Sequence, residues 1–211
     1  MKHRYSDVID VFNSLFSKLE STILVCGGDE PYYKPGEGPD RPAQVVFARG
    51  YFASALHEVA HWCIAGRQRR LLPDYGYWYV PDGRSAEQQL EFVKVEVKPQ
   101  AMEWVFSAAA GSQFHFSADN LPSGGCVTDQ SWLDFQFKVA QQAQNFVVHG
   151  LPQRAELFAV ALAQYYRTDN SWRDPGLYKV NRSFEPPTIA LSTANLHGDS
   201  RAAKRALEGL I

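Results

Sequence analysis

The feature that most constrains this chain is a pair of histidines four residues apart, His57 and His61, with Glu58 directly after the first. Residues at positions i and i+4 of a helix lie one above the other, with Cβ atoms about 5–6 Å apart. Two imidazoles at that spacing can bind one metal ion, and a glutamate between them can handle the proton of a metal-bound water. The motif therefore predicts a metal site on a helix, with His57 and His61 as ligands and Glu58 as a catalytic residue.

The residues around this motif predict a mostly buried helix over residues 51–65. Apolar side chains recur at helical spacing at Phe52, Leu56, Val59, Ala60, Cys63 and Ile64. An ordinary helix with polar residues on one side is the alternative, but buried imidazoles and a buried carboxylate cost free energy without partners. A metal ion accounts for all three polar residues together. A strand predicted over residues 43–48 precedes the helix, which is the order in zinc metallopeptidases with the same motif.

Length and composition indicate one globular, enzyme-sized domain. The chain has 211 residues, of which 45% are hydrophobic, and this is enough to bury a sizeable core. A net charge of −2 at pH 7 gives no reason to expect nucleic acid as a partner. The three cysteines, Cys26, Cys63 and Cys126, form no close pair and indicate a reducing compartment. No apolar signal core or membrane span is found, so we expect a soluble cytoplasmic protein without membrane contact.

Other elements follow from local patterns. These predict helices over residues 5–20, 132–150 and 152–166, strands over 23–25 and 75–80, and a proline-rich loop over 27–41. From Pro175 onward the pattern weakens, and two adjacent prolines at 186–187 break it. We therefore expect a metal-dependent domain over residues 1–182 and a loosely held C-terminal tail over residues 183–211.

Residues 85–110 carry two conflicting signals. Ser85 and Gln88 form a capping box, which favours the start of a helix. Three valines alternate with charged residues over 93–98, which is typical of a strand. We predict a helix over this range, and we expect Pro99 to kink or interrupt it.

A catalytic metal site normally takes a third protein ligand and keeps positions open for water or substrate. A histidine is one source of that ligand, and a carboxylate on the predicted helix is the other. The histidines are His115, His149 and His197, and the carboxylates are Glu87, Glu91, Glu96 and Glu103. Each of these histidines stands alone in the sequence, so the carboxylates are better placed. Spacing does not choose among the four.

Four motifs stand in order along the chain. They are Phe47-Ala48-x-Gly50, Ala55-x-His57-Glu58-x-x-His61-Trp62-Cys63-Ile64-Ala65-Gly66, Gly76-Tyr77-Trp78-Tyr79-x-Pro81-Asp82-Gly83-Arg84 and Val95-Glu96-Val97-Lys98-Pro99-Gln100-Ala101. Together they closely resemble the elongation factor P hydroxylase family of gammaproteobacteria, over roughly residues 5 to 170. In that family a metal, thought to be iron, is held by the two motif histidines and the later glutamate. The resemblance therefore implies His57, His61 and Glu96 as metal ligands here.

The same resemblance implies the reaction and the partner. Family members hydroxylate a lysine of elongation factor P after a separate ligase has attached a β-lysyl group to it. This implies elongation factor P as the protein substrate, Fe(II) as the metal with zinc as a replacement, and dioxygen as a co-substrate. The hydroxylase domain would span residues 1–182. The chain lacks the His-x-Asp…His pattern of 2-oxoglutarate oxygenases, so the electron donor stays open.

A zinc metallopeptidase with Glu58 as the general base is the second interpretation. The His-Glu-x-x-His motif alone favours the peptidase, and the four motifs together favour the hydroxylase. Both share one expected fold, a single α+β domain in which the metal helix packs on a second helix bearing Glu96. A small sheet lies alongside, in a zincin-like active-site arrangement.

The substrate implied by the resemblance carries a long cationic side chain. An amine that leaves water needs a compensating charge. We therefore expect acidic groups along a cleft that ends at the metal. The available candidates are Glu58, Asp74, Asp82 and Glu103.

Overall fold

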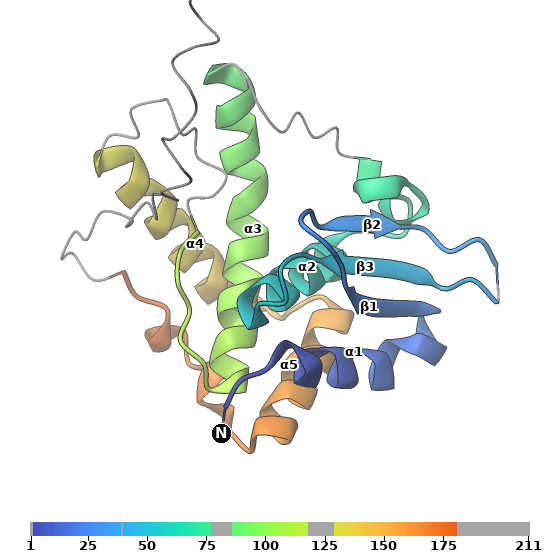
Figure 1. Ribbon diagram of the computed structural model, residues 1–211. Helices are drawn as coiled ribbons and strands as arrows, with labels where there is room; N and C mark the ends of the chain where they lie inside the picture. Colours follow the sequence, from blue (N-terminus) through green and yellow to red (C-terminus); the bar gives the residue numbers. More distant parts are fainter. Residues whose placement is uncertain (1, 39, 77–85, 118–128, 181–211) are drawn as a thin grey trace, which may run out of the picture.

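The computed structural model describes residues 2–38, 40–76, 86–117 and 129–180. Its elements in chain order are α1 (Tyr5–Leu19), β1 (Thr22–Cys26), β2 (Tyr32–Lys34), β3 (Ala43–Phe47), α2 (Phe52–Ile64), α3 (Ala86–Ala110), α4 (Asp129–His149) and α5 (Gln153–Tyr166). Short 3-10 turns follow α2 at Arg69–Leu71 (η1) and Pro73–Gly76 (η2), and follow α5 at Asn170–Arg173 (η3) and Pro175–Leu177 (η4). Figure 1 shows a small sheet beside a group of helices. The predicted single-domain α+β class is confirmed.

The sheet has three strands in the order β1-β3-β2. β1 runs parallel to β3, with Leu24 opposite Val45, and β2 runs antiparallel to β3, with Tyr33 opposite the same residue. Leu24, Tyr33 and Val45 are all buried, because the sheet covers one side of the helices. The strands predicted over 23–25 and 43–48 are confirmed.

β2 lies inside the predicted loop over 27–41, which is therefore wrong at residues 32–34. A strand of three residues between Pro31 and Pro35 is too short to show an alternating pattern. Pairing with β3, which no local signal reports, makes this segment a strand.

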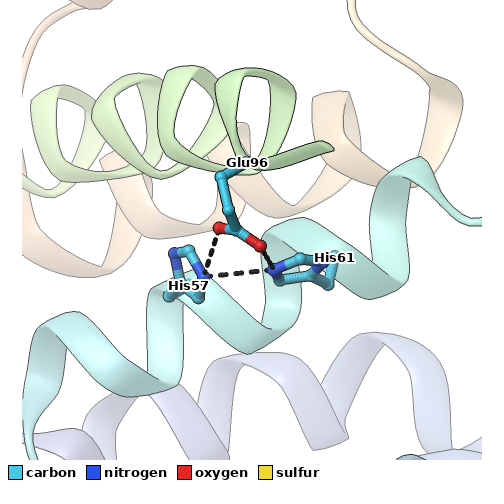
Figure 2. A group of neighbouring side chains, drawn as sticks. All are labelled: His57, His61 and Glu96. Carbon is cyan, nitrogen blue, oxygen red and sulfur yellow. Dashed lines mark hydrogen bonds and ion pairs between the residues drawn. The ribbon is translucent and has the colours of Figure 1, made fainter. Parts of the chain in front are cut away.

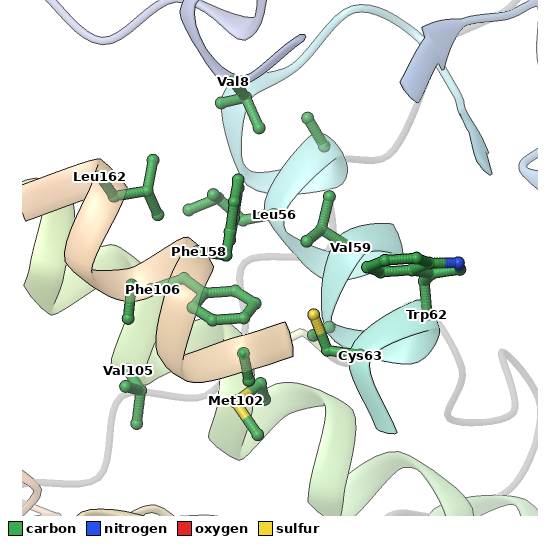
Figure 3. Packing of buried hydrophobic residues seen from close by; sticks show 14 of the residues in the cluster. Val8, Leu56, Val59, Trp62, Cys63, Met102, Val105, Phe106, Phe158 and Leu162 are labelled. Carbon is green, nitrogen blue, oxygen red and sulfur yellow. The ribbon is translucent and has the colours of Figure 1, made fainter. Parts of the chain in front are cut away.

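The hydrophobic core forms where α1, α2, α3 and α5 meet. Figure 3 shows side chains from all four helices in contact: Val8, Leu56, Val59, Trp62, Met102, Val105, Phe106, Phe158 and Leu162, each with no exposed surface. Burial of each such side chain stabilises the fold by roughly 1.5–3 kcal/mol. The predicted metal helix α2 is thus held between α1, α3 and the sheet.

α3 confirms the helix predicted over 85–110 and excludes the strand alternative. The helix continues across Pro99, so the expected interruption does not occur. A proline inside a helix costs about 3 kcal/mol. Pro99 is buried, and packing of α3 against α2, α4 and α5 holds the helix together on both sides of it. Ser85, the predicted cap, lies outside the described residues.

The strand predicted over 75–80 is wrong at its first two residues, Tyr75 and Gly76. Tyr75 belongs to the turn η2, where Asp74 and Tyr75 both take left-handed backbone conformations, with φ of 47° and 58°. Two contacts hold this turn. The Asp74 carboxylate accepts a hydrogen bond of 2.7 Å from the Tyr33 N–H, and the Tyr75 ring stacks on the Tyr33 ring at 4.4 Å. Residues 77–80 lie outside the described part.

After α5 the chain returns to the core. Trp172 and Tyr178 are fully buried, and the Tyr178 hydroxyl donates a hydrogen bond to the backbone carbonyl of Trp172. The core therefore extends past Pro175, where the sequence pattern weakens. The expected boundary after residue 182 and the tail over 183–211 lie outside the described residues. Among the helices that the structure describes, none combines the length and apolar character that a membrane span requires.

Candidate metal centre

A tight turn places the start of α2 directly after the sheet. Between β3 and α2, Arg49 and Gly50 take left-handed backbone conformations, with φ of 59° and 62°. A Cβ atom on Gly50 would lie 3.3 Å from the Tyr5 ring, so glycine suits both the conformation and the limited space. The helix that follows carries His57 and His61 one turn apart on one face, as the spacing predicts.

The carboxylate of Glu96 reaches both histidines from α3 (Figure 2). Its Oε2 lies 3.4 Å from His57 Nε2, and its Oε1 lies 3.5 Å from His61 Nε2. The two Nε2 atoms are 3.1 Å apart. Of the two candidate carboxylates whose side chains the structure describes, Glu96 and Glu103, only Glu96 joins the histidines in a group whose ligand atoms all lie within 4.8 Å of one another.

This donor set fits a divalent metal ion. Ligand atoms about 2.0–2.2 Å from a metal lie about 3–3.6 Å from each other, and the three atom pairs are 3.1–3.5 Å apart. Glu96 is 2% exposed, and its Oε2 has no hydrogen-bond partner among the described residues, which costs about 1–3 kcal/mol or more for a buried charged group. A cation between the three side chains would remove that cost. Two histidines and one carboxylate serve in both catalytic zinc and non-haem iron(II) sites.

A second buried carboxylate contacts the other nitrogen of the His57 ring. His57 Nδ1 lies 2.9 Å from Oε2 of Glu103, which is also on α3. Glu103 is 6% exposed. Glu103, one of the candidates for the third ligand, therefore lies next to the predicted site but outside the three-residue group.

The electrostatics of the site favour a positive charge between the helices. Burial opposes protonation of His57, but the hydrogen bond to Glu103 and the negative charges of Glu96 and Glu103 outweigh it and raise the pKa of His57 well above the ordinary 6.5. Burial also pushes the pKa of Glu96 upward, yet the rings of His61 and His57 hold it well below its ordinary value. Glu96 is therefore ionised at neutral pH, ready to bind a cation.

Glu58 follows His57 on α2 and is only partly buried. Burial raises its pKa, and the nearby rings of His61 and His57 only partly offset this. A raised pKa makes this carboxyl group a stronger base than an ordinary glutamate, and a base beside a metal site can accept and return a proton. Glu58 stays the candidate catalytic residue.

Some of the remaining candidates are described and lie outside the three-residue group, and the side chains of the others are not described. His115 and His149 are exposed and do not join the three-residue group, and Asp74 is engaged by the Tyr33 backbone. The side chains of Glu87, Glu91, Asp82 and His197 lie outside the part of the chain that the structure describes. The contact between Glu103 and His57 was not foreseen. The sequence offers one signal for it, because Glu103 stands two helical turns after Glu96 and so shares its face.

Comparison with known proteins identifies the family. The model of the elongation factor P hydroxylase family matches residues 11–174, a range that includes α2 and the three residues of the candidate site. The elongation factor P lysine hydroxylase of Haemophilus influenzae is 46% identical over 170 residues, which cover 81% of this chain and 93% of that protein. The resemblance seen in the four motifs is confirmed, and the chain belongs to the elongation factor P hydroxylase family.

Proposed function

We propose that this protein hydroxylates the β-lysylated lysine of elongation factor P, with a metal held by His57, His61 and Glu96. The single observation that carries the site is the buried Glu96 carboxylate, 3.4–3.5 Å from both histidines, with one oxygen that no described residue hydrogen-bonds. The identity with a protein named elongation factor P lysine hydroxylase supports the substrate. Because translation takes place in the cytoplasm, the proposal also places the enzyme there.

Iron(II) is the metal that we propose for this site. Two histidines and one carboxylate suit iron(II) and leave coordination positions open. When bound, iron would supply the activation of dioxygen, in which one oxygen atom is inserted into a C–H bond of the substrate and the second leaves as water, with two electrons from a separate reductant and two protons. Zinc binds similar ligands and would replace iron without supporting this chemistry.

The protein's own contribution is to hold the ligands and to exclude water. His57 and His61 lie on α2 and Glu96 on α3, and the two helices pack against each other through the core. The side chains of these residues are only 3–19% exposed. Rigid, buried ligands keep the metal in one geometry and limit the access of bulk solvent to the reacting atoms.

Glu58 is the acid best placed to meet the cationic substrate. Among the described acids expected along the cleft, Asp74 is bonded to Tyr33 and Glu103 to His57, whereas Glu58 is partly exposed next to the site. It would either balance the charge of the substrate amine or hold a proton during the reaction. Substitution to Gln separates these roles, because loss of charge balance raises KM and loss of proton transfer lowers kcat.

A zinc metallopeptidase would use the same three ligands, with Glu58 as the base that activates water. Membership of the hydroxylase family favours the hydroxylase over this alternative. The two reactions also leave different products, an oxidised side chain in one case and a cleaved chain in the other.

The experiment that tests the proposal measures the mass of β-lysylated elongation factor P after incubation with iron-loaded protein and a reductant under ¹⁸O₂. We expect a gain of one labelled oxygen atom, located on the modified lysine by fragmentation. His61→Ala should give no gain, and His115→Ala, at an exposed histidine away from the site, should behave as wild type. An unchanged mass together with peptide-bond cleavage would instead identify a peptidase.

A further inference from the structure

We propose that Glu103 is a positioning residue for the metal and acts through His57. Its carboxylate accepts a hydrogen bond from the Nδ1–H of His57, which directs the opposite ring nitrogen, Nε2, toward the ion. The inference rests on the proposed metal site and deepens it. Two distances carry it: 2.9 Å from His57 Nδ1 to Glu103 Oε2, and 3.4 Å from His57 Nε2 to Glu96 Oε2.

The position of Glu103 excludes it as a fourth ligand. Among the described residues, the group of converging ligand atoms consists of His57, His61 and Glu96. The two nitrogens of an imidazole point away from each other, so a carboxylate on Nδ1 lies behind the ring when Nε2 faces the metal. Glu103 can therefore influence the ion only through the ring of His57.

A stabilising ion pair does not explain why a carboxylate stands here. A buried ion pair is often no more stabilising than apolar residues of the same volume, because both charges lose their hydration. Met102 and Phe106, which flank Glu103 on α3, are apolar and fully buried. An apolar residue at position 103 would thus be compatible with the packing, and control of the His57 ring is what the carboxylate adds.

The hydrogen bond determines which tautomer of His57 is ready for the metal. An imidazole that binds a metal through Nε2 carries its proton on Nδ1, and a carboxylate at that proton fixes the tautomer and the ring orientation. It also makes Nε2 a better electron donor. Among the described residues, the polar contacts of the His61 ring run through Nε2, to His57 and to Glu96. His57 is therefore the histidine of the pair whose ring a carboxylate holds through the opposite nitrogen.

The test measures the affinity of the purified full-length protein for Co(II), a probe whose visible absorption reports its ligand geometry. Glu103→Ala should weaken binding about 10–100-fold, with an unchanged shape of the absorption spectrum because the three ligands remain. Glu103→Gln should recover most of the affinity, because its amide oxygen can accept the same hydrogen bond. Gln100→Ala is the matched control. Gln100 is buried on α3 and bonds the Ser117 backbone, so this variant reports general damage to the helix and should bind Co(II) as wild type does.

A second readout needs no substitution. In the Zn(II)-loaded protein, ¹⁵N NMR should show the His57 ring protonated at Nδ1, with slow exchange of that proton, so the inference stays testable if Glu103→Ala does not fold. A His57 ring protonated at Nε2 overturns the inference. Equal Co(II) affinity of wild type and Glu103→Ala overturns it and leaves the proposed metal site standing. A changed spectrum overturns it in favour of Glu103 as a ligand. Failure of the wild type to bind Co(II) overturns the proposed site and the inference together.

Discussion

Arg154 on α5 lies over the ring of Trp62 on α2, with its guanidinium carbon 4.5 Å from the ring centroid. The same guanidinium donates hydrogen bonds to the backbone carbonyls of Trp62 at 2.9 Å, Cys63 at 3.2 Å and Ala65 at 2.6 Å. The last carbonyls of a helix have no partner within the helix, and a cation there also complements the helix dipole. Arg154 thus caps the C-terminal end of the helix that carries the candidate metal ligands.

Arg154→Met should therefore destabilise the protein by about 3 kcal/mol. It removes charge-assisted hydrogen bonds worth roughly 1.5–3 kcal/mol and a cation–π contact worth roughly 1–2 kcal/mol, while keeping most of the apolar stem. Urea unfolding measures the change. Arg173→Met is the matched control, because Arg173 lies over Trp172 but is 44% exposed, so its loss should cost less than about 1 kcal/mol. Equal effects of the two substitutions would show that the cap is unimportant.

Tyr75→Phe should leave the free energy of unfolding unchanged or raise it by up to about 1 kcal/mol. The Tyr75 side chain is buried, and within the part of the chain that the structure describes its hydroxyl has no hydrogen-bond partner, so the wild type carries the desolvation cost of an unsatisfied group. Tyr33→Phe is the control on its stacking partner. The Tyr33 hydroxyl donates to the Arg70 carbonyl at 3.0 Å, so that substitution should cost about 1 kcal/mol. A clear loss of stability in Tyr75→Phe would mean that a water or another group bonds this hydroxyl in solution.

His61→Ala should abolish metal binding and leave most of the fold intact. A core of this size does not need the ion to fold, and His61 itself is partly exposed. Metal content after dialysis, read together with the circular dichroism spectrum, checks both parts. Full metal occupancy in this variant would contradict the ligand assignment, and a random-coil spectrum would contradict the claim that the ion is dispensable for folding.

Metal affinity should increase with pH, by about tenfold per unit below the pKa of His57 in the metal-free protein. The neighbouring carboxylates raise that pKa well above 6.5, so binding must displace a proton from His57 at neutral pH. The lowered pKa of Glu96 keeps this carboxylate ionised, and it adds no slope. The contribution of His57 to the free energy of unfolding depends on pH in the opposite direction and decreases as the pH rises. The raised pKa of His57 adds stability that is fully present below pH 6.5, and this stability is lost as the pH rises through the pKa of His57 in the folded protein.

Competition with a coloured chelator at several pH values between 6 and 8 measures the slope of affinity against pH. In Glu103→Gln, one of the two carboxylates that raise the pKa of His57 is neutral. The rise in affinity should therefore level off at a lower pH than in the wild type. A slope near zero in the wild type would show that His57 is already neutral over this range.

Local sequence patterns predicted those helices and strands whose signal comes from residues close together in the chain. The i and i+4 spacing of His57 and His61 places them on one helical face whatever surrounds the helix, because the helical repeat alone decides it. The apolar spacing in α1 likewise predicted its buried face, with Val8 and Phe12 fully buried. Where a side chain stands at the edge of such a face, the pattern fails. Leu157 and Leu19 belong to the apolar positions of their helices, but they are 42% and 72% exposed.

The tertiary structure decided everything that joins distant segments. Spacing alone left Glu96 equivalent to three other carboxylates, since neighbouring positions on a helix differ by 100° in direction and packing sets which of them faces α2; only the motifs shared with the hydroxylase family pointed to it. Packing of Met102 and Phe106 against the other helices fixes that rotation, and it brings Glu96 and Glu103 to opposite nitrogens of His57. β2 and the Arg154 cap have the same origin, because each depends on a partner far away in the chain. The sequence by itself determined that two histidines would share a helix face, and only the packed helices decided that Glu103 would meet the other nitrogen of His57.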